Sequence, residues 1–464
     1  MKLKREKWGS RLGFILAAAG SAIGLGNVWK FPYIAGENGG AAFIFVYLIC
    51  IAVIGLPVLI AEVLLGRSTH RNPVGAFRKL SNSKFWTAVG GMGVLAGFVI
   101  LSYYSVVAGW SLGYVIEAIK GTFHDYTTTS SSGEHFGSLV SNVLWSIGYL
   151  AAFMVLTMVL VYRGVQKGIE SGSKIMMPIL FILLIALMVR GLTLPGSEAG
   201  LSFLWSPDWS KISANSVLIA LGHAFFTLSL GMGAMMTYGS YMTQKANIPV
   251  ASTKVVFLDT VIALIAGMAI FTAVFATGQD PAAGPGLIFH TLPVVFIKMP
   301  GGYIFAILFF ILLTIAALTS AISLLEVVVA YFVDERGWKR HRAVITFGIV
   351  IFLIGVPSTL SFNLMADATL FGLTFFDLAD FLAANILLPL GGLFIAVFVA
   401  WVWGFDKALI KMKDGAEAIF ENSGWLIVLW KIFLKYFAPI LIFLVFLSSI
   451  GILPKIINFF TDLF

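Results

Sequence analysis

The first apolar segment of this chain is interrupted in its middle by three glycines and a serine. The interrupted stretch reads Gly20-Ser21-Ala22-Ile23-Gly24-Leu25-Gly26-Asn27. A helix that crosses a bilayer keeps its backbone hydrogen bonds within itself, because hydrocarbon offers no water to replace them. Glycine weakens a helix, and irregular backbone at membrane depth occurs only where it is buried in protein or lines a cavity. The stretch therefore predicts free carbonyl and N–H groups that meet a cation, an anionic substrate group, or both.

The composition indicates that this segment lies in a membrane. Of the 464 residues, 59% are hydrophobic and 11% are charged, whereas about a quarter of a soluble domain is charged. We predict a polytopic membrane protein without a soluble domain. No removable signal peptide is expected, since no small-residue cleavage site follows the basic N-terminus. The single cysteine, Cys50, excludes a disulfide framework.

Eleven apolar spans are predicted from length and hydrophobicity. They run near 12–35, 41–66, 87–119, 141–162, 173–193, 214–242, 252–277, 301–333, 343–360, 376–403 and 430–453. The net charge of +8 comes from basic residues in short segments between the spans, so it indicates orientation rather than nucleic-acid binding. Their clusters lie near 2–11, 67–84, 163–174, 336–342 and 407–435. This bias predicts a cell-membrane protein with its N-terminus in the cytoplasm and its C-terminus outside.

A second break interrupts the sixth span, within Phe225-Phe226-Thr227-Leu228-Ser229-Leu230-Gly231-Met232-Gly233. A single glycine-broken helix is more often a kink against a neighbour. Two broken helices in corresponding positions of two halves instead indicate a transporter site at the midplane of the bilayer. We therefore expect one transmembrane domain over residues 1–464. It would contain inverted repeats at about 10–193 and 214–403 and an extra helix at about 430–453.

Several motifs add to these two breaks. They are Gly24-Leu25-Gly26-Asn27-Val28-Trp29-Lys30-Phe31-Pro32-Tyr33, Glu37-Asn38-Gly39-Gly40-Ala41-Ala42-Phe43, Tyr103-Tyr104 and Ala317-Leu318-Thr319-Ser320. In these motifs the chain resembles the neurotransmitter:sodium symporter family, especially its bacterial amino-acid members, over nearly its whole length. The resemblance implies an all-α, LeuT-like fold with a 5+5 inverted repeat and broken helices 1 and 6. The family fold has twelve helices, of which about eleven are predicted here.

The resemblance also implies two sodium ions, which prefer hard oxygen ligands. One site, Na1, would take ligands from Ala22, Asn27, Thr227 and Asp259. The other, Na2, would take carbonyls of Gly20, Ile23 and Ala316 and hydroxyls of Thr319 and Ser320. Taken alone, the last two hydroxyls would be interpreted as hydrogen bonds between neighbouring helices.

Gly24 bears on the class of substrate. Family members that carry monoamines have an aspartate at this position, and it replaces a substrate carboxylate. Glycine leaves the space open, so the resemblance implies a substrate with its own carboxylate, an amino acid. Its carboxylate would bind at the positive end of a half-helix. The residues implied are Leu25, Gly26 and Tyr104 for the carboxylate, and Ala22, Phe226, Thr227 and Ser229 for the ammonium group.

The lining of the side-chain pocket is expected to be apolar, so that a charged substrate side chain would be left unpaired. The lining residues are Ile100, Tyr104, Phe226, Met232, Ser320 and Leu324, and Ser21 and Gly24 complete the predicted substrate site. Met232 replaces a phenylalanine of another family member, and a flexible thioether can make room for larger groups. Substrates from leucine to tryptophan in size are expected.

Asp259 departs from the family pattern, in which asparagine is usual. A carboxylate within a bilayer is costly, by roughly 2.5–3.5 kcal/mol on insertion scales. Besides a structural role, it could neutralise sodium and replace the chloride that animal members require. Ala263 lacks the hydroxyl that those members use for chloride, and His223 replaces a glutamine nearby. Transport without chloride is therefore predicted.

Charged residues on both sides of the predicted site match the gates of the family. Lys30 and Asp380 correspond to an outer gate, although lysine lacks the bidentate fork of arginine. Arg5 and Asp334 correspond to an inner latch, which Trp8 and Tyr241 surround. Gly168 and Pro178 could let the cytoplasmic end of the fifth span unwind. Glu62 is expected to accept hydrogen bonds from N–H groups freed at the second break.

Together these features predict sodium-coupled import of a hydrophobic L-amino acid by alternating access. Sodium and the amino acid, rather than nucleic acid, are the expected partners besides the lipid bilayer. An amino-acid sensor that scarcely transports is the main alternative. A membrane enzyme is disfavoured, because the six histidines are dispersed and no nucleophile–base pair lies at the midplane. A channel is disfavoured because gates on both sides suit occlusion.

Overall fold

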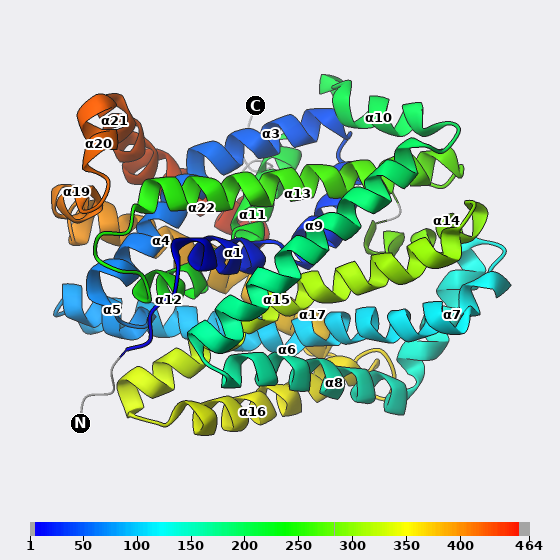
Figure 1. Cartoon of the computed structure of the whole chain (residues 1–464), viewed down its shortest axis with the longest axis horizontal. Coiled ribbons are helices and arrows are strands. Elements are labelled where there is room, and N and C mark those ends of the chain that lie inside the picture. The colour runs from blue at the N-terminus through cyan, green and yellow to red at the C-terminus, as the bar shows by residue number, and fades with distance from the viewer. Residues whose placement is uncertain (1–4, 283, 454–464) are drawn as a thin grey trace.

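A computed structural model describes residues 5–282 and 284–453 of the chain. Within these ranges every regular element is a helix, apart from an isolated bridge between Leu370 and Leu373. Most of the long helices lie side by side and run roughly horizontally in Figure 1. Lys2 and Lys4, which belong to the predicted N-terminal basic cluster, lie outside the described residues.

Nine helical runs in the described part of the chain are long and apolar enough to cross a membrane. Some contain π-helical turns, which are wider than α-helical ones; these turns and the tighter 3-10 helices are both labelled η. The runs comprise α3 (Ala41–Cys50), η2 (Ile51–Gly55) and α4 (Leu56–Thr69); α6 (Lys84–Lys120); α8 (Val143–Tyr162); η4 (Val165–Glu170) and α9 (Ser171–Leu192); α13 (Ile248–Ala276); α15 (Gly302–Arg336); α16 (Arg340–Leu360); α17 (Phe375–Asp380), η7 (Phe381–Leu387), α18 (Leu388–Val397) and η8 (Phe398–Val402); and α21 (Gly424–Ile432), η9 (Phe433–Phe437) and α22 (Ala438–Ser449).

Shorter helices connect these runs. They are α5 (Pro73–Leu80), η3 (Thr122–Asp125), α7 (Thr129–Ser141), α10 (Ser197–Trp205), η5 (Trp209–Lys211), η6 (Gly284–Leu287), α14 (Thr291–Lys298), α19 (Phe405–Lys413) and α20 (Glu417–Asn422).

Both breaks predicted from the glycines are present. The first helix consists of α1 (Arg11–Ala22) and a second part formed by η1 (Gly26–Lys30) and α2 (Phe31–Glu37), bent by 48°. If this bent pair is counted as one span, residues 5–282 and 284–453 contain up to ten spans by length and composition. The predicted sixth span contains α11 (Ala214–Thr227) and α12 (Ala234–Ser240), joined by non-helical residues 228–233. Each of these two helices is too short to cross a bilayer alone.

The fifth span starts earlier than predicted. Its helical run begins at Val165 rather than near residue 173. Gly164, with a φ of +88°, ends the preceding turn, and the wide turn η4 then winds directly into α9. The polar residues Gln166, Lys167 and Glu170 lowered the hydrophobicity of this turn and concealed it from a search for apolar residues.

The helix α1 lies near the centre of the bundle, where it packs against α9, α12, α13 and α15.

The helices α4 and α12 approach each other closely at small residues. A Cβ atom at Gly66 in α4 would lie 1.9 Å from the Met236 carbonyl oxygen in α12. At Gly239 in α12 it would lie 2.5 Å from the Val63 carbonyl oxygen in α4. Two glycines thus allow α4 to support the second half of the broken sixth helix.

Candidate functional site

The first break leaves backbone groups available in the middle of the bundle. Residues 23–25 lie between α1 and η1, and the chain resumes its winding when Asn27 N–H donates to the Gly24 carbonyl at 3.2 Å. The Asn27 side-chain oxygen accepts from Gly24 N–H at 3.2 Å. Asn27 is fully buried, so its amide replaces water as a partner for the interrupted helix.

Hydroxyl groups from α15 face the carbonyls at the end of α1. The Thr319 hydroxyl lies 3.3 Å from the Ile23 carbonyl and 2.9 Å from that of Ala316. The Ser320 hydroxyl lies 3.4 Å from the Gly20 carbonyl. The five residues predicted for Na2 therefore converge at one place. Carbonyl and hydroxyl oxygens without a carboxylate are a donor set that fits a hard monovalent cation.

The residues predicted for Na1 also lie together, with Asp259 of α13 at their centre. Its carboxylate accepts from the Asn27 amide at 2.8 Å and from the Thr227 hydroxyl at 3.1 Å. The exposed fraction of these three side chains is at most 1%. Ala22, the fourth residue predicted for Na1, is buried at the end of α1 and lines a small cavity between the two breaks. Among the described residues this buried carboxylate forms no ion pair and has two neutral donors, which favours a bound cation.

A small cavity lies between the two breaks. Twelve of the thirteen residues predicted to bind substrate line it, and the exception, Thr227, instead contacts Asp259. The lining residues are Ser21, Ala22, Gly24, Leu25, Gly26, Ile100, Tyr104, Phe226, Ser229, Met232, Ser320 and Leu324. Its volume of about 30 Å³ equals roughly that of one water molecule. The surrounding helices must therefore separate before an amino acid can enter.

Polar groups from both breaks and from α6 and α15 line this cavity. Leu25 N–H donates to the Tyr104 hydroxyl at 3.3 Å, where the carboxylate was predicted to bind. The Ser229 hydroxyl donates to the Ser21 carbonyl at 2.8 Å. At Gly24 a Cβ atom would lie 2.3 Å from the Ser320 hydroxyl oxygen and 2.9 Å from that of Tyr104. Any side chain at this position would fill the cavity.

The second break is held by the carboxylate predicted for this role. Glu62 of α4, which is fully buried, accepts from Gly231 N–H at 2.6 Å. Ser229, Gly231 and Gly233 have φ values of +53°, +81° and +74°, so the chain here adopts left-handed conformations that end α11. Glycine adopts these at little cost, which explains two of the three residues.

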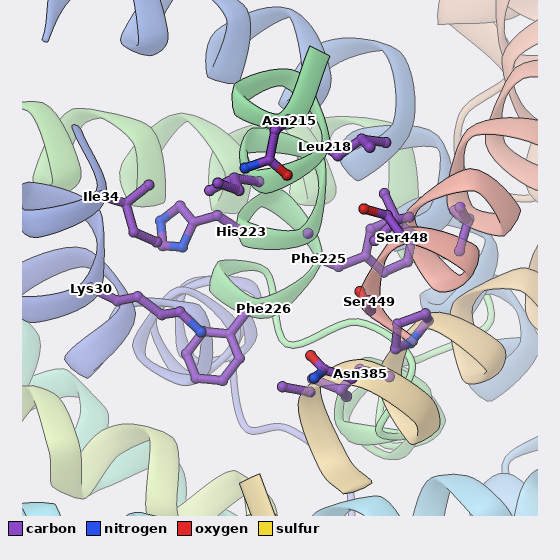
Figure 2. A pocket seen from close by; sticks show the side chains of 17 residues that line it. Lys30, Ile34, Asn215, Leu218, His223, Phe225, Phe226, Asn385, Ser448 and Ser449 are labelled. Carbon is purple, nitrogen blue, oxygen red and sulfur yellow. The ribbon is translucent and has the colours of Figure 1, made fainter. Parts of the chain in front are cut away.

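On the side predicted to face outward, Phe226 and Lys30 cover the cavity. The Lys30 amine lies 4.5 Å from the centre of the Phe226 ring. Figure 2 shows the Lys30 side chain extending to this ring. The described residues form no direct ion pair between Lys30 and Asp380, so the predicted outer gate, closed through water, stays a prediction. A larger cavity of about 320 Å³ lies beside Lys30, between α11, α18 and α22.

The residues predicted for the inner latch contact one another. Arg5 forms an ion pair with Asp334, and it also donates to Ser240. Its guanidinium group lies 4.8 Å from the centre of the Tyr241 ring. Trp8 donates from its indole N–H to the Tyr238 carbonyl at 2.9 Å and is 8% exposed. These contacts join the start of α1 to α12 and α15.

Several residues near the site were not identified from the sequence. Ser323 accepts from the Ser21 hydroxyl at 2.6 Å. Glu326 is fully buried in α15, where it pairs with Arg340 and accepts from the Tyr241 hydroxyl at 2.5 Å. A glutamate within an apolar helix is itself a signal for a functional or paired group, and it could have been used. Nothing in the local sequence could reveal its partner.

Comparisons with known proteins agree with this arrangement. The family model described as "Sodium:neurotransmitter symporter family" matches residues 5–135 and 130–459. An uncharacterized sodium-dependent transporter of Bacillus subtilis, YhdH, is 42% identical over 97% of this chain and 99% of its own length. An uncharacterized sodium-dependent transporter of Haemophilus influenzae is 36% identical over 96% of this chain and 98% of its own.

A solved structure is similar in fold as well as in sequence. The crystal structure of MhsT in complex with L-phenylalanine aligns with a TM-score of 0.87 and 49% identity, and it covers 96% of this chain and 100% of that one. The predicted LeuT-like fold is confirmed by this match. Since a family model matches most of its length and full-length relatives exceed 30% identity, the chain belongs to the sodium:neurotransmitter symporter family.

Proposed function

We propose that this sodium-dependent symporter imports a hydrophobic L-amino acid by alternating access. The observation that carries the proposal is the cavity between the two breaks, whose lining residues present an N–H group, hydroxyl groups and a backbone carbonyl. This polarity suits a zwitterion. Its apolar wall, which includes Ile100, Met232 and Leu324, suits a hydrophobic side chain. The similar MhsT structure holds L-phenylalanine.

Two sodium ions are part of the proposal. Asn27, Thr227, Asp259 and the Ala22 carbonyl would hold the first, and the α1 and α15 oxygens would hold the second. The first ion would neutralise both Asp259 and the substrate carboxylate. Because ion and substrate share this charge balance, each should increase the affinity for the other by the same factor.

Chloride independence is the third part. Asp259 supplies a fixed negative charge next to the proposed sodium ligands, with Asn27 and Thr227 as its donors. Ala263, one turn further along α13, is buried and offers no hydroxyl to an anion. A negative charge that belongs to the protein removes the need for a chloride ion at the same place.

Transport would follow from the two closed sides of the cavity. Sodium and substrate would close the outer side around Phe226 and Lys30, and release of the second sodium would then loosen α1 and the Arg5 latch. The orientation that the basic residues predict, with the N-terminus in the cytoplasm of a cell membrane, puts this latch on the inner side.

A competition panel tests the substrate. The twenty amino acids would compete for binding of labelled phenylalanine to purified protein, in sodium and in potassium. Leucine-sized to tryptophan-sized side chains should compete in sodium only. No preference for sodium over potassium would refute the proposal. Counterflow of labelled amino acid in proteoliposomes, with gluconate in place of chloride, distinguishes transport from the alternative of a sensor.

A further inference from the structure

A carboxylate outside the proposed binding site joins the start of the first helix to the fifth span. Glu170, the last residue of η4, is 2% exposed. One of its carboxylate oxygens accepts from Gly9 N–H at 2.6 Å, and the other accepts from the Ser10 hydroxyl at 2.8 Å. Lys174, one turn along α9, lies 2.6 Å from the second oxygen. The carboxylate thus accepts three hydrogen bonds, and two of them come from residues at the start of α1.

The start of α1 is shaped to receive this carboxylate. Ser10 is the N-cap of α1, and its oxygen accepts from Gly13 N–H at 2.9 Å while its proton points to Glu170. A negative charge at a helix N-terminus is stabilised by the helix dipole. A Cβ atom at Gly13 would lie 2.2 Å from the Glu170 carboxylate, and one at Gly9 would lie 3.2 Å from it. Glycine at both positions leaves the room that the carboxylate occupies.

The element that carries Glu170 is itself poorly wound. In η4 the Gly164 carbonyl accepts from both Gly168 and Ile169, which is a shared and widened turn. A Cβ atom at Gly168 would lie 1.9 Å from the Leu160 carbonyl oxygen, so this turn depends on glycine. Such a turn costs less to unwind than the regular helix α9 that follows it.

Two further contacts join the same segments, but they are less protected from water. Glu6 accepts from Val165 N–H at 2.5 Å, and the Gln166 amide donates to the Lys7 carbonyl at 2.9 Å. The Glu6 side chain is 42% exposed, whereas that of Glu170 is 3% exposed. Hydrogen bonds to a buried charge contribute more than those at the surface. Glu170 is therefore the principal link. The helices α1 and α9 are also in contact, and Figure 1 shows α9 running obliquely past α1.

We propose that Glu170 is a positioning residue that couples the start of α1 to the turn η4, so that the inner side opens only when η4 rearranges. The inference rests on the proposed function for the meaning of that opening. The Arg5 latch holds α1 against α12 and α15, whereas Glu170 holds it against the fifth span. Movement of α1 away from its place removes the partners of a buried carboxylate, unless η4 moves with it.

Hydrogen–deuterium exchange of the full chain in lipid nanodiscs tests this coupling. Sodium would be titrated against potassium, and exchange would be followed at residues 9–13 and at residues 165–170. In the unsubstituted protein both segments should become protected at the same sodium midpoint. In Glu170→Gln the two midpoints should separate by about tenfold, which corresponds to one charge-assisted hydrogen bond. Coincident midpoints in Glu170→Gln, or separate ones already in the unsubstituted protein, would overturn the proposal.

Two further variants make the test specific. Gly13→Ala, whose Cβ expels the carboxylate, should separate the midpoints as Glu170→Gln does, and it should add nothing in a Glu170→Ala background. Lys174→Gln, which leaves both contacts to α1 in place, should keep the midpoints together. Full additivity, or separation in Lys174→Gln, contradicts the coupling. Because exchange needs no transport, a chain that binds no amino acid would refute the proposed function alone.

Discussion

At the scale of single residues, Gly24 keeps space open in the proposed substrate site. Gly24→Ala places a methyl group against the hydroxyl oxygens of Ser320 and Tyr104, at 2.3 and 2.9 Å from the glycine's ideal Cβ position. Affinity for phenylalanine should fall by about fivefold or more, because overpacking costs roughly 1–3 kcal/mol. Scintillation-proximity binding in sodium measures this. The control is Gly91→Ala in α6, where a Cβ atom meets nothing within 4 Å. Equal affinities in the two variants would contradict the placement of the site.

Asp259 gives the second residue-scale prediction. Asp259→Asn keeps the size of the side chain but removes the buried charge that accepts from Asn27 and Thr227. The sodium concentration for half-maximal binding should rise about tenfold, since contacts with a charged group contribute about 1.5–3 kcal/mol. Asp367→Asn, at an exposed position, is the control. We also expect chloride to restore part of the lost affinity. An unchanged sodium midpoint would exclude Asp259 from the ion site.

At the scale of elements, the contact between α4 and α12 decides whether the sixth helix can be broken. Gly66→Ala would place a Cβ atom 1.9 Å from the Met236 carbonyl oxygen and push the helices apart. The melting temperature should fall by several degrees, because overpacking lowers the free energy of unfolding by about 1–3 kcal/mol. Gly148→Ala in α8, where nothing lies within 4 Å, should leave the melting temperature unchanged or raise it. Thermal unfolding in detergent, followed by fluorescence, compares them. Similar melting temperatures would argue against close packing here.

At the scale of the whole molecule, we expect the contacts of the proposed inner latch to set the balance between conformations. Arg5→Ala removes the ion pair with Asp334 and the contacts with Ser240 and Tyr241. The inward-open population should grow, and apparent affinity for phenylalanine should fall by the fraction of competent protein that is lost. Arg78→Ala is a matched control. The Arg78 side chain, which pairs with Glu335, is 58% exposed, and ion pairs exposed to water contribute little. Binding isotherms at fixed sodium distinguish the variants, and a loss in Arg78→Ala equal to that in Arg5→Ala would refute the latch.

Much of this fold could be predicted from local sequence. Both breaks lie where glycines interrupt apolar segments, and Glu62 contacts the second break as expected. The predicted start of the fifth span was wrong. The span begins with η4, which follows Gly164 and is too polar to be recognised by its hydrophobicity. The link from Glu170 to Gly9 and Ser10 was not foreseen. Its partners are about 160 positions apart, and no local pattern reports such a distance.

The sequence by itself determined where the transmembrane helices are interrupted, because glycine weakens a helix wherever it lies. In hydrocarbon, backbone groups that lose their helical partners find no water to replace them. It also determined that the free groups must be buried. Only the tertiary structure decided which polar groups come into contact. The Thr319 hydroxyl contacts the Ile23 carbonyl and the Asp259 carboxylate contacts the Asn27 amide, because α15 and α13 pack against α1. These contacts depend on packing between distant segments, and packing is a property of the assembled bundle rather than of any one helix.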